Sequence, residues 1–298
     1  MPRIETSSMQ SVIEKASVLI EALPYIQRFR GETVVVKFGG SIMDDNTGIS
    51  NILKDVAFME CVGLRPVIVH GGGKAISRQM KKQGMKSSFL KGLRITDAET
   101  IGIVEQVLNH KVNPHLVDIL QGFNCRARGM HGDDILQVKR HTEKDSETGK
   151  TLDWGYVGDV VKVDTAPVEA FLRGGITPVI TPLGRGEDRC IFNVNADDAA
   201  AALARELKAR KLVFLSDVPG LLADPTDMES RISTVKMKEV ESLIKRKVIS
   251  GGMLPKITGA VNALKEGVRK THIIDSGMPH SLLLELFTDK GVGTEIIH

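Results

Sequence analysis

Two glycine-rich turns stand where this chain could hold anions. The apolar run Val34–Phe38 ends at Gly39–Gly40, and the apolar run Pro66–His70 ends at Gly71–Gly73. Helical periodicity follows each turn, so bare backbone N–H groups would gather at a helix N-terminus, which favours a phosphate or a carboxylate. We therefore expect a protein that holds phosphates and a second anionic ligand side by side.

Three cationic side chains are candidates to bind those anions. Lys37 lies in an otherwise apolar strand, Lys256 begins a helix after a glycine pair, and Arg94 precedes a helix start. A buried lysine needs an anionic partner, and a guanidinium fork suits a carboxylate. The structural alternatives are an internal salt bridge for Lys37, an exposed first-turn lysine for Lys256 and a helix-capping salt bridge for Arg94.

A cluster of polar residues marks a further strand-to-helix transition. The segment FNVNADD (192–198) holds Asn193, Asn195, Asp197 and Asp198. An Asn or Asp at such a point is a common helix N-cap. Capping accounts for one of these four side chains, so the others are candidates for a site.

Several common catalytic signatures are absent. The phosphate-loop pattern GxxxxGK[ST] fails because Lys144 replaces the glycine that should precede Gly149–Thr151. No GxGxxG, GxSxG or HExxH occurs, which argues against a dinucleotide enzyme, a serine hydrolase and a zinc protease. His110 and His115 could form a metal pair, but surface or capping histidines are the simpler interpretation.

The composition is that of a globular protein. The chain has 298 residues, of which 42% are hydrophobic, enough for one large domain or two lobes. A net charge of +3 and dispersed basic residues argue against a nucleic-acid partner. Three cysteines without CxxC spacing argue against a disulfide framework. No apolar run approaches the ~20 residues that cross a bilayer, so we expect a cytoplasmic protein with no membrane partner.

The hydrophobic pattern alternates between short apolar strands and amphipathic helices. It predicts an α/β fold whose mainly parallel sheet has helices on both faces. Helices are expected over 97–109 and, separately, over 113–121. Two alternating stretches flank the polar segment His141–Asp153, which predicts a β-hairpin with a mobile tip. The character of the sequence changes near 182–188, where we expect a boundary between lobes.

An amphipathic helix is expected before the first strand. Apolar residues recur at helical spacing from Met9 to Leu23, and Pro24 then interrupts the pattern, so a kink is expected there. The apolar face needs a partner. The pattern alone leaves two alternatives open, packing on its own domain and pairing with another subunit.

Together these residues resemble the amino acid kinase family, and most closely its acetylglutamate-phosphorylating branch. The likeness runs from about Leu23 to the C-terminus. It is carried by VVVKFGGS (34–41), VIVHGGGKAI (67–76), KGLRITD (91–97), FNVNADDAAAALA (192–204), LVFLSDVPGLL (212–222) and SGGMLPKI (250–257).

The resemblance implies a role for each matching residue. Two lysines stabilise the transferring phosphoryl group, an aspartate organises them, and other residues bind acetylglutamate or ATP. Where the glycine pair ends, Ser41 departs from the Asn of many relatives, although a small polar residue still fits. The implied residues are Lys37, Lys256 and Asp197 for catalysis, Gly72, Gly73, Arg94 and Asn193 for acetylglutamate, and Gly39, Gly40 and Asp217 for the nucleotide.

The resemblance also implies a fold and a reaction. The fold is a three-layer αβα sandwich with a helical extension over 1–30, a substrate lobe over 31–181 and a nucleotide lobe over 182–298. The reaction is ATP-dependent phosphorylation of the γ-carboxylate of N-acetyl-L-glutamate, giving N-acetyl-L-glutamyl 5-phosphate in arginine biosynthesis. That carboxylate is already ionised at neutral pH, so no general base is needed. Mg²⁺ would arrive with ATP, without dedicated protein ligands.

Both chain ends resemble the arginine-inhibited members of the branch. The segments 270–295 and ALPYI (22–26) carry this likeness. In these relatives, N-terminal helices interlock dimers into a hexamer, so the likeness favours an intersubunit role for the N-terminal helix. A PII-type signalling protein is a further candidate partner. The implied allosteric arginine site consists of Tyr25, His272, Glu285 and Gly291.

Two other functions stay open. One is a related kinase that acts on a different acidic substrate, such as an aminoadipate derivative. The other is a catalytically silent regulator that binds a nucleotide or an amino acid on the same fold. Retention of Lys37, Lys256 and Asp197 argues against the silent regulator.

Overall fold

The molecule is built on one large mixed sheet. The computed structural model describes residues 6–145, 148–224, 226–288 and 291–298. Its eight strands follow the order β12-β14-β13-β11-β1-β2-β8-β5, and all neighbours pair in parallel except β13 and β14. The strands are β1 (Thr33–Phe38), β2 (Arg65–His70), β5 (Ala127–Met130), β8 (Thr177–Ile180), β11 (Lys211–Ser216), β12 (Thr234–Lys236), β13 (Lys270–Asp275) and β14 (Thr294–Ile297).

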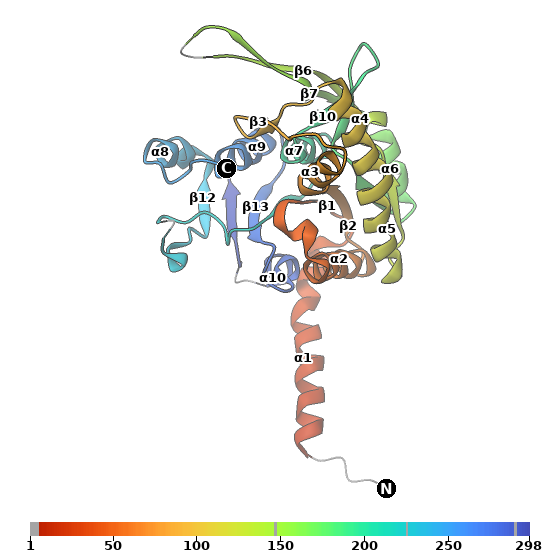
Figure 1. The fold of residues 1–298 in the computed structure, drawn as a ribbon. Helices are drawn as coiled ribbons and strands as arrows, with labels where there is room; N and C mark the ends of the chain where they lie inside the picture. Colours follow the sequence, from red (N-terminus) through yellow and green to blue (C-terminus); the bar gives the residue numbers. More distant parts are fainter. Residues whose placement is uncertain (1–5, 146–147, 225, 289–290) are drawn as a thin grey trace.

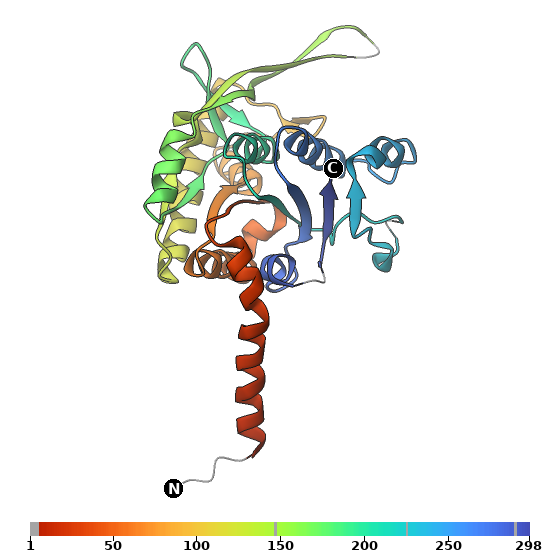
Figure 2. The same ribbon diagram turned by 180° about the vertical axis from the view of Figure 1, so that it is seen from behind.

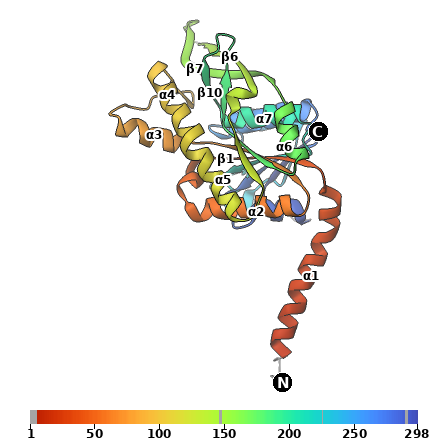
Figure 3. The same ribbon diagram turned by 90° about the vertical axis from the view of Figure 1, so that its right-hand side faces the viewer.

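Helices cover both faces of this sheet (Figures 1 and 3), which confirms the predicted three-layer sandwich. One face carries three helices and the other carries three more. The first group is α2 (Asn46–Cys61), α5 (Asn113–Gly122) and α10 (Ser281–Phe287), and the second is α6 (Ala166–Arg173), α7 (Ala196–Glu206) and α9 (Met253–Lys265).

Strand β1 explains why its sequence is apolar at nearly every position. Val34 and Val36 pack with α2 and α10, whereas Val35 packs with α7 and α9. A strand covered on both faces needs apolar side chains in both directions. By the same alternation, Lys37 lies on the face of α7, and it is buried there.

A smaller sheet closes into a barrel beside the large one. It consists of β6 (Leu136–Lys144), β7 (Thr151–Val163), β9 (Leu183–Arg185) and β10 (Ile191–Val194). β6 and β7 form the predicted hairpin, which projects from the body (Figure 1). The predicted tip was too long, because most of His141–Asp153 is strand with both faces exposed and therefore lacks alternation. Residues 146–147 of that segment lie outside the described residues.

The two helices expected over 97–109 and 113–121 are instead one interrupted helix. α4 (Ala98–Val107) runs through a π-helical turn (Leu108–Val112) directly into α5. Helix α3 (Gly73–Lys82) contacts α4, and the short strands β3 (Phe89–Leu90) and β4 (Leu93–Arg94) pair with each other. Helix α8 (Val240–Lys245) lies near the edge strand β12 (Figure 1).

Helix α1 (Thr6–Phe29) continues through Pro24 and projects away from the body (Figures 1 and 2). Only its last turns join the core, through Tyr25, Ile26 and Phe29. Most of the predicted apolar face does not pack on its own domain, since Met9, Val12, Ile13, Leu19, Ile20 and Leu23 are exposed. Within the described parts of the chain, no helix combines the length and hydropathy that crossing a membrane requires.

Candidate active site

The two glycine turns lie against each other at the carboxyl ends of β1 and β2. A Cβ atom built on Gly39 would come within 3.2 Å of the Gly71 Cα atom, and one built on Gly71 within 3.1 Å of the Gly39 Cα atom. Gly71 N–H also donates a 2.7 Å hydrogen bond to Phe38 O. Gly40 has a φ of +74°, in the left-handed region that favours glycine. The close approach of two backbones is therefore what these glycines make room for.

Lys37 and Lys256 meet at one carboxylate. Lys37 Nζ lies 2.7 Å from Asp197 Oδ1, and Lys256 Nζ lies 2.9 Å from Asp197 Oδ2. The internal salt bridge considered for Lys37 therefore exists, but its partner is a predicted site residue. A Cβ built on Gly39 would lie 3.6 Å from Lys37 Nζ, so the paired cations stand at the glycine turns.

The charges of this trio are tuned by burial and by one another. Burial lowers the pKa of Lys37, and the charge of Lys256 adds to that effect against the attraction of Asp197. Burial alone would raise the pKa of Asp197, but the two lysines outweigh it and hold that pKa below its usual range. Asp197 is therefore held as an anion between the two lysines.

Asp197 owes its position to the start of α7. Asn195 caps this helix, and its side-chain oxygen accepts hydrogen bonds from the N–H groups of Asp197 and Asp198. Within the polar cluster, Asn195 is therefore the N-cap, and the side chain of Asp197 contacts the two lysines. Asn193, on β10, donates a 3.4 Å hydrogen bond to Thr96 Oγ1.

Arg94 is anchored next to the second glycine turn. Its guanidinium donates to Gly73 O at 2.9 Å, to Ser77 Oγ at 2.8 Å and to Ser87 Oγ at 2.7 Å, and it stacks on the Phe89 ring at 4.7 Å. Helix α3 begins at Gly73 without a side-chain cap. The first N–H groups of α3 and the buried Arg94 therefore lie together, as a carboxylate site would require. Ser77 and Ser87 carry no sequence signal that predicted this role.

The predicted nucleotide residues also lie together. Ser41 Oγ donates a 3.3 Å hydrogen bond to Asp217 Oδ2, which joins the turn after β1 to the loop after β11. In the described parts of the chain, no group of three or more His, Cys, Asp and Glu side chains is arranged as a metal site. Both oxygens of Asp197 already face lysines, so the residues present do not form a site for a metal of their own.

Comparison with known proteins decides the family. The model of the amino acid kinase family matches residues 32–275. The chain belongs to the amino acid kinase family. It is 46% identical to the acetylglutamate kinase of Heliobacterium modesticaldum, over 97% of this chain and 100% of that protein. It is also 46% identical to the acetylglutamate kinase of Akkermansia muciniphila, over 98% of each chain.

Solved structures agree with this family. N-acetylglutamate synthase from Neisseria gonorrhoeae, complexed with coenzyme A and N-acetyl-glutamate, matches with a TM-score of 0.82 at 28% identity. The match covers 95% of this chain but 63% of that synthase. Carbamate kinase from Giardia lamblia matches with a TM-score of 0.64 at 15% identity, which is a likeness of fold alone.

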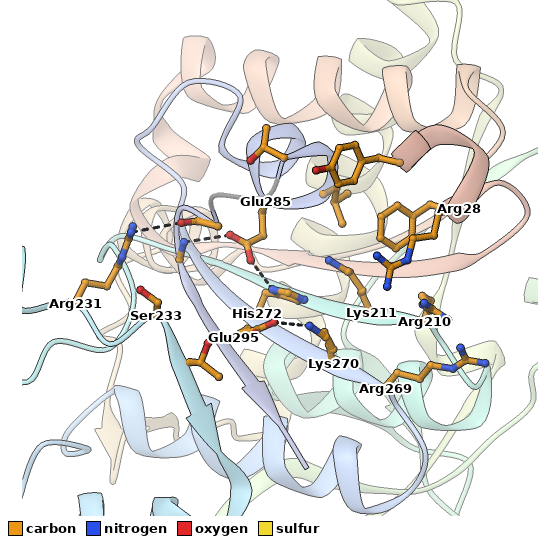
Figure 4. A pocket seen from close by; sticks show the side chains of 17 residues that line it. Arg28, Arg210, Lys211, Arg231, Ser233, Arg269, Lys270, His272, Glu285 and Glu295 are labelled. Carbon is orange, nitrogen blue, oxygen red and sulfur yellow. Dashed lines mark hydrogen bonds and ion pairs between the residues drawn. The ribbon is translucent and has the colours of Figure 1, made fainter. Parts of the chain in front are cut away.

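This amino acid kinase has a cavity at the amino ends of β11 and β13, at the opposite end of the strands from the lysine trio. Its volume is about 700 Å³. All four residues predicted for the arginine site line it, namely Tyr25, His272, Glu285 and Gly291. Figure 4 shows His272 and Glu285 facing each other there. Glu285 Oε1 lies 2.6 Å from His272 Nδ1, and Glu285 Oε2 accepts from Val292 N–H at 2.8 Å. A cavity with a fixed, buried carboxylate suits a cationic group.

The same cavity holds a buried lysine that our sequence analysis missed. Lys211 is 8% exposed, and its Nζ lies 5.1 Å from the centre of the Phe29 ring. No carboxylate of the described residues forms an ion pair with it. Burial lowers the pKa of Lys211 to about 8. Lys211 begins an apolar strand, so the signal that singled out Lys37 would have found it as well.

Proposed function

We propose that this kinase uses ATP to phosphorylate the γ-carboxylate of N-acetyl-L-glutamate, giving N-acetyl-L-glutamyl 5-phosphate in arginine biosynthesis. The carrying observation is the Lys37–Asp197–Lys256 trio at two touching glycine turns. Relatives 46% identical over nearly the whole chain bear the name acetylglutamate kinase, which supports this choice of substrate. The proposed setting is the cytoplasm.

The geometry suits a transfer between two anions. A substrate carboxylate needs no base, since its pKa of about 4.3 leaves it ionised at neutral pH. Lys37 and Lys256 approach Asp197 from two elements far apart in the sequence, so both ammonium groups can face the charge that develops on the phosphoryl group. Asp197 keeps the two cations apart at a fixed spacing, which a mobile pair of lysines would not hold.

The two turns would divide the ligands between them. Gly39 and Gly40, with Asp217 held by Ser41, are proposed to face the ATP phosphates. Gly72, Gly73, Arg94 and Asn193 are proposed to face acetylglutamate. Mg²⁺ would enter with ATP on its phosphates, because the described residues offer it no ligand set of their own.

A coupled assay of ADP release tests this proposal. The purified protein is given ATP and, in turn, acetylglutamate, glutamate, aspartate and aminoadipate. We expect acetylglutamate to give the highest kcat/KM. A preference for aminoadipate would favour the related-kinase alternative. If none of these substrates leads to ADP release, a silent regulator is favoured. Trapping the acyl phosphate product as a hydroxamate distinguishes phosphoryl transfer from simple ATP hydrolysis.

We further propose that L-arginine inhibits this enzyme by binding in the cavity lined by Glu285 and Lys211. Glu285 would bind the guanidinium, while Lys211, a cation without an acidic partner in the described structure, would bind the α-carboxylate. A related synthase is known in complex with coenzyme A and L-arginine, at a TM-score of 0.79 and 27% identity. This cavity lies at the opposite end of the strands from the lysine trio. Inhibition therefore requires that arginine favour one arrangement of the molecule over another.

Helix α1 is proposed to carry that coupling between subunits. Its exposed apolar face has no partner on its own domain among the described residues, and its last turn lines the arginine cavity through Tyr25 and Arg28. A second copy of the helix would cover that face, and interlocked dimers would then form a homohexamer. A PII-type signalling protein is a further proposed partner of this assembly.

A further inference from the structure

A buried histidine stands directly behind the second glycine turn. His70 ends β2 and is fully buried. Its Nδ1 lies 2.9 Å from Gly71 O, and its Nε2 lies 3.1 Å from Asn113 Nδ2. Asn113 Nδ2 also donates a 2.8 Å hydrogen bond to Val179 O. A chain of hydrogen bonds therefore connects β8, α5 and the glycine turn.

This chain fixes the direction of every hydrogen bond in it. The Val179 carbonyl can only accept, so the amide group of Asn113 that faces it must be the NH₂. The other hydrogen of that NH₂ points to Nε2, which must therefore accept and carry no proton. The proton of a neutral imidazole is then on Nδ1, and it is donated to Gly71 O. Burial lowers the pKa of His70 to about 4, so the ring stays neutral at any pH at which a kinase would work.

A π-helical turn brings Asn113 to this histidine. Leu108 O accepts from Asn113 N–H, the i to i+5 bond of a π-turn. In an α-helix, residues five apart would lie about 140° apart around the axis, whereas the i to i+5 bond of the π-turn brings Leu108 and Asn113 closer to the same side of the helix. Pro114 favours the wider turn, because its ring lacks an N–H and clashes with the carbonyl four residues earlier.

The π-helical turn packs closely against two glycines, Gly72 of the glycine turn and Gly129 of β5. A Cβ on Gly72 would clash with Leu108 Cδ2, and a Cβ on Gly129 would clash with Asn113 Oδ1. Leu108 thus packs directly under the glycine turn while Asn113 holds its histidine from behind. Gly129, on β5, leaves the space that Asn113 needs.

We propose that Asn113, acting through His70, is a positioning residue for the substrate turn. The described peptide bonds are all trans, so Gly71 C=O and Gly72 N–H point in opposite directions. With the carbonyl held on His70 Nδ1–H, the Gly72 N–H faces away from the histidine, toward the uncapped start of α3 and the side proposed for acetylglutamate. The inference rests on that proposed role of Gly72 and Gly73.

Asn113→Asp tests the direction of the hydrogen bonds without changing the shape of the side chain. A carboxylate cannot donate, so Nε2 takes the proton and Nδ1 of the neutral ring no longer donates to Gly71 O. We expect the KM for acetylglutamate at pH 8 to rise about tenfold to a hundredfold, the range for one lost hydrogen bond to a charged ligand. The introduced carboxylate raises the pKa of the ring, which regains its Nδ1 proton as the pH falls, so the KM at pH 6 should lie closer to the wild-type value than the KM at pH 8.

Two further variants separate positioning from mere packing. Asn113→Leu removes the donor and the titrating partner together, so its KM should be high at both pH values. Asn109→Leu is the matched control, since Asn109 lies in the same turn and is also buried, and its side-chain oxygen has no hydrogen-bond partner within the described structure. Its KM should match that of the wild type, and thermal melts of all variants monitor folding.

The outcomes are separable. The inference is overturned if Asn113→Asp keeps the wild-type KM, or if its KM is raised equally at pH 6 and pH 8. If that variant does not fold, Gly129→Ala decides: it keeps both side chains but forces Asn113 to shift, so an unchanged KM rejects the inference. Should the wild type prefer another acidic substrate, the proposed function fails, and the same KM comparison on that substrate still judges the positioning role.

Discussion

Two buried lysines lie at opposite ends of the neighbouring strands β1 and β11, and their surroundings differ. Lys37 is near the carboxyl end of β1 and pairs with Asp197, whereas Lys211 begins β11, opposite Val34, and has no acidic partner within the described structure. Burial lowers the pKa of both. A lysine with a fixed carboxylate is held in place before any ligand arrives, while a lysine without one gains most from a ligand that brings an anion.

The difference separates a proposed catalytic end of the strands from a proposed regulatory end. Ligands of open α/β sheets bind beyond the carboxyl ends of the strands, where both glycine turns lie. The proposed arginine cavity lies at the other end of the strands, lined by residues of α1, β11, β13 and α10. Variants at the carboxyl ends of the strands should therefore change turnover, and variants in the proposed arginine cavity should change inhibition alone.

The largest effect is expected at the trio. Lys37→Ala and Lys256→Ala should each lower kcat by about 10²–10³, the usual loss for one donor to a developing charge. The KM for acetylglutamate should change far less. Lys211→Ala is the matched control at the other end of the strands and should keep the wild-type kcat. Near-normal turnover of a folded Lys37 or Lys256 variant would reject their assignment.

The next largest effect is expected from Arg94→Lys. An ammonium cannot reproduce the two-pronged contact of a guanidinium, nor reach Gly73 O, Ser77 and Ser87 together. We expect the KM for acetylglutamate to rise about tenfold to a hundredfold, with little change in the KM for ATP or in arginine inhibition. Steady-state kinetics with each substrate varied in turn gives the answer, and an equal loss of ATP affinity would place Arg94 at the wrong ligand.

Truncation of α1 should abolish both hexamer formation and arginine inhibition. Removing residues 1–28 takes away the exposed apolar face together with Tyr25 and Arg28, so hexamers should become dimers that retain kcat and lose arginine inhibition. A shorter deletion, 1–20, keeps both pocket residues. It should also give dimers, but with arginine binding still measurable by calorimetry. Light scattering of the full chain and both deletions sizes the particles, and a truncated enzyme that stays hexameric contradicts the role of α1.

Sequence patterns predicted those features whose signal is local. A strand apolar on both faces, glycines at its end and a lysine within it were enough to place Lys37 at the turns, and the resemblance supplied its partners. The union of α4 and α5 was not predicted, because the i to i+5 bonds that carry the helix through Leu108–Val112 leave no periodicity in the sequence. Lys211 was missed although it carries the same signal as Lys37, since no motif drew attention to the start of its strand.

The smallest effect, and the sharpest test of the comparison, is the pH dependence of inhibition. The pKa of Lys211 is lowered to about 8, because burial and the charges of Lys270 and Arg28 outweigh the attraction of Glu285 and Glu295, so the free cavity loses a cation as the pH rises through that value. In the proposed arginine site, that cation binds the arginine carboxylate. Its inhibition constant should therefore rise by up to about tenfold between pH 7 and pH 9, while kcat follows the trio instead. Lys211→Arg carries a permanent charge and should flatten this dependence, whereas Lys211→Met should be inhibited weakly at both pH values. An inhibition constant that rises equally in the wild type and in Lys211→Arg would assign the titration to arginine itself, and Lys211 would not be its carboxylate partner.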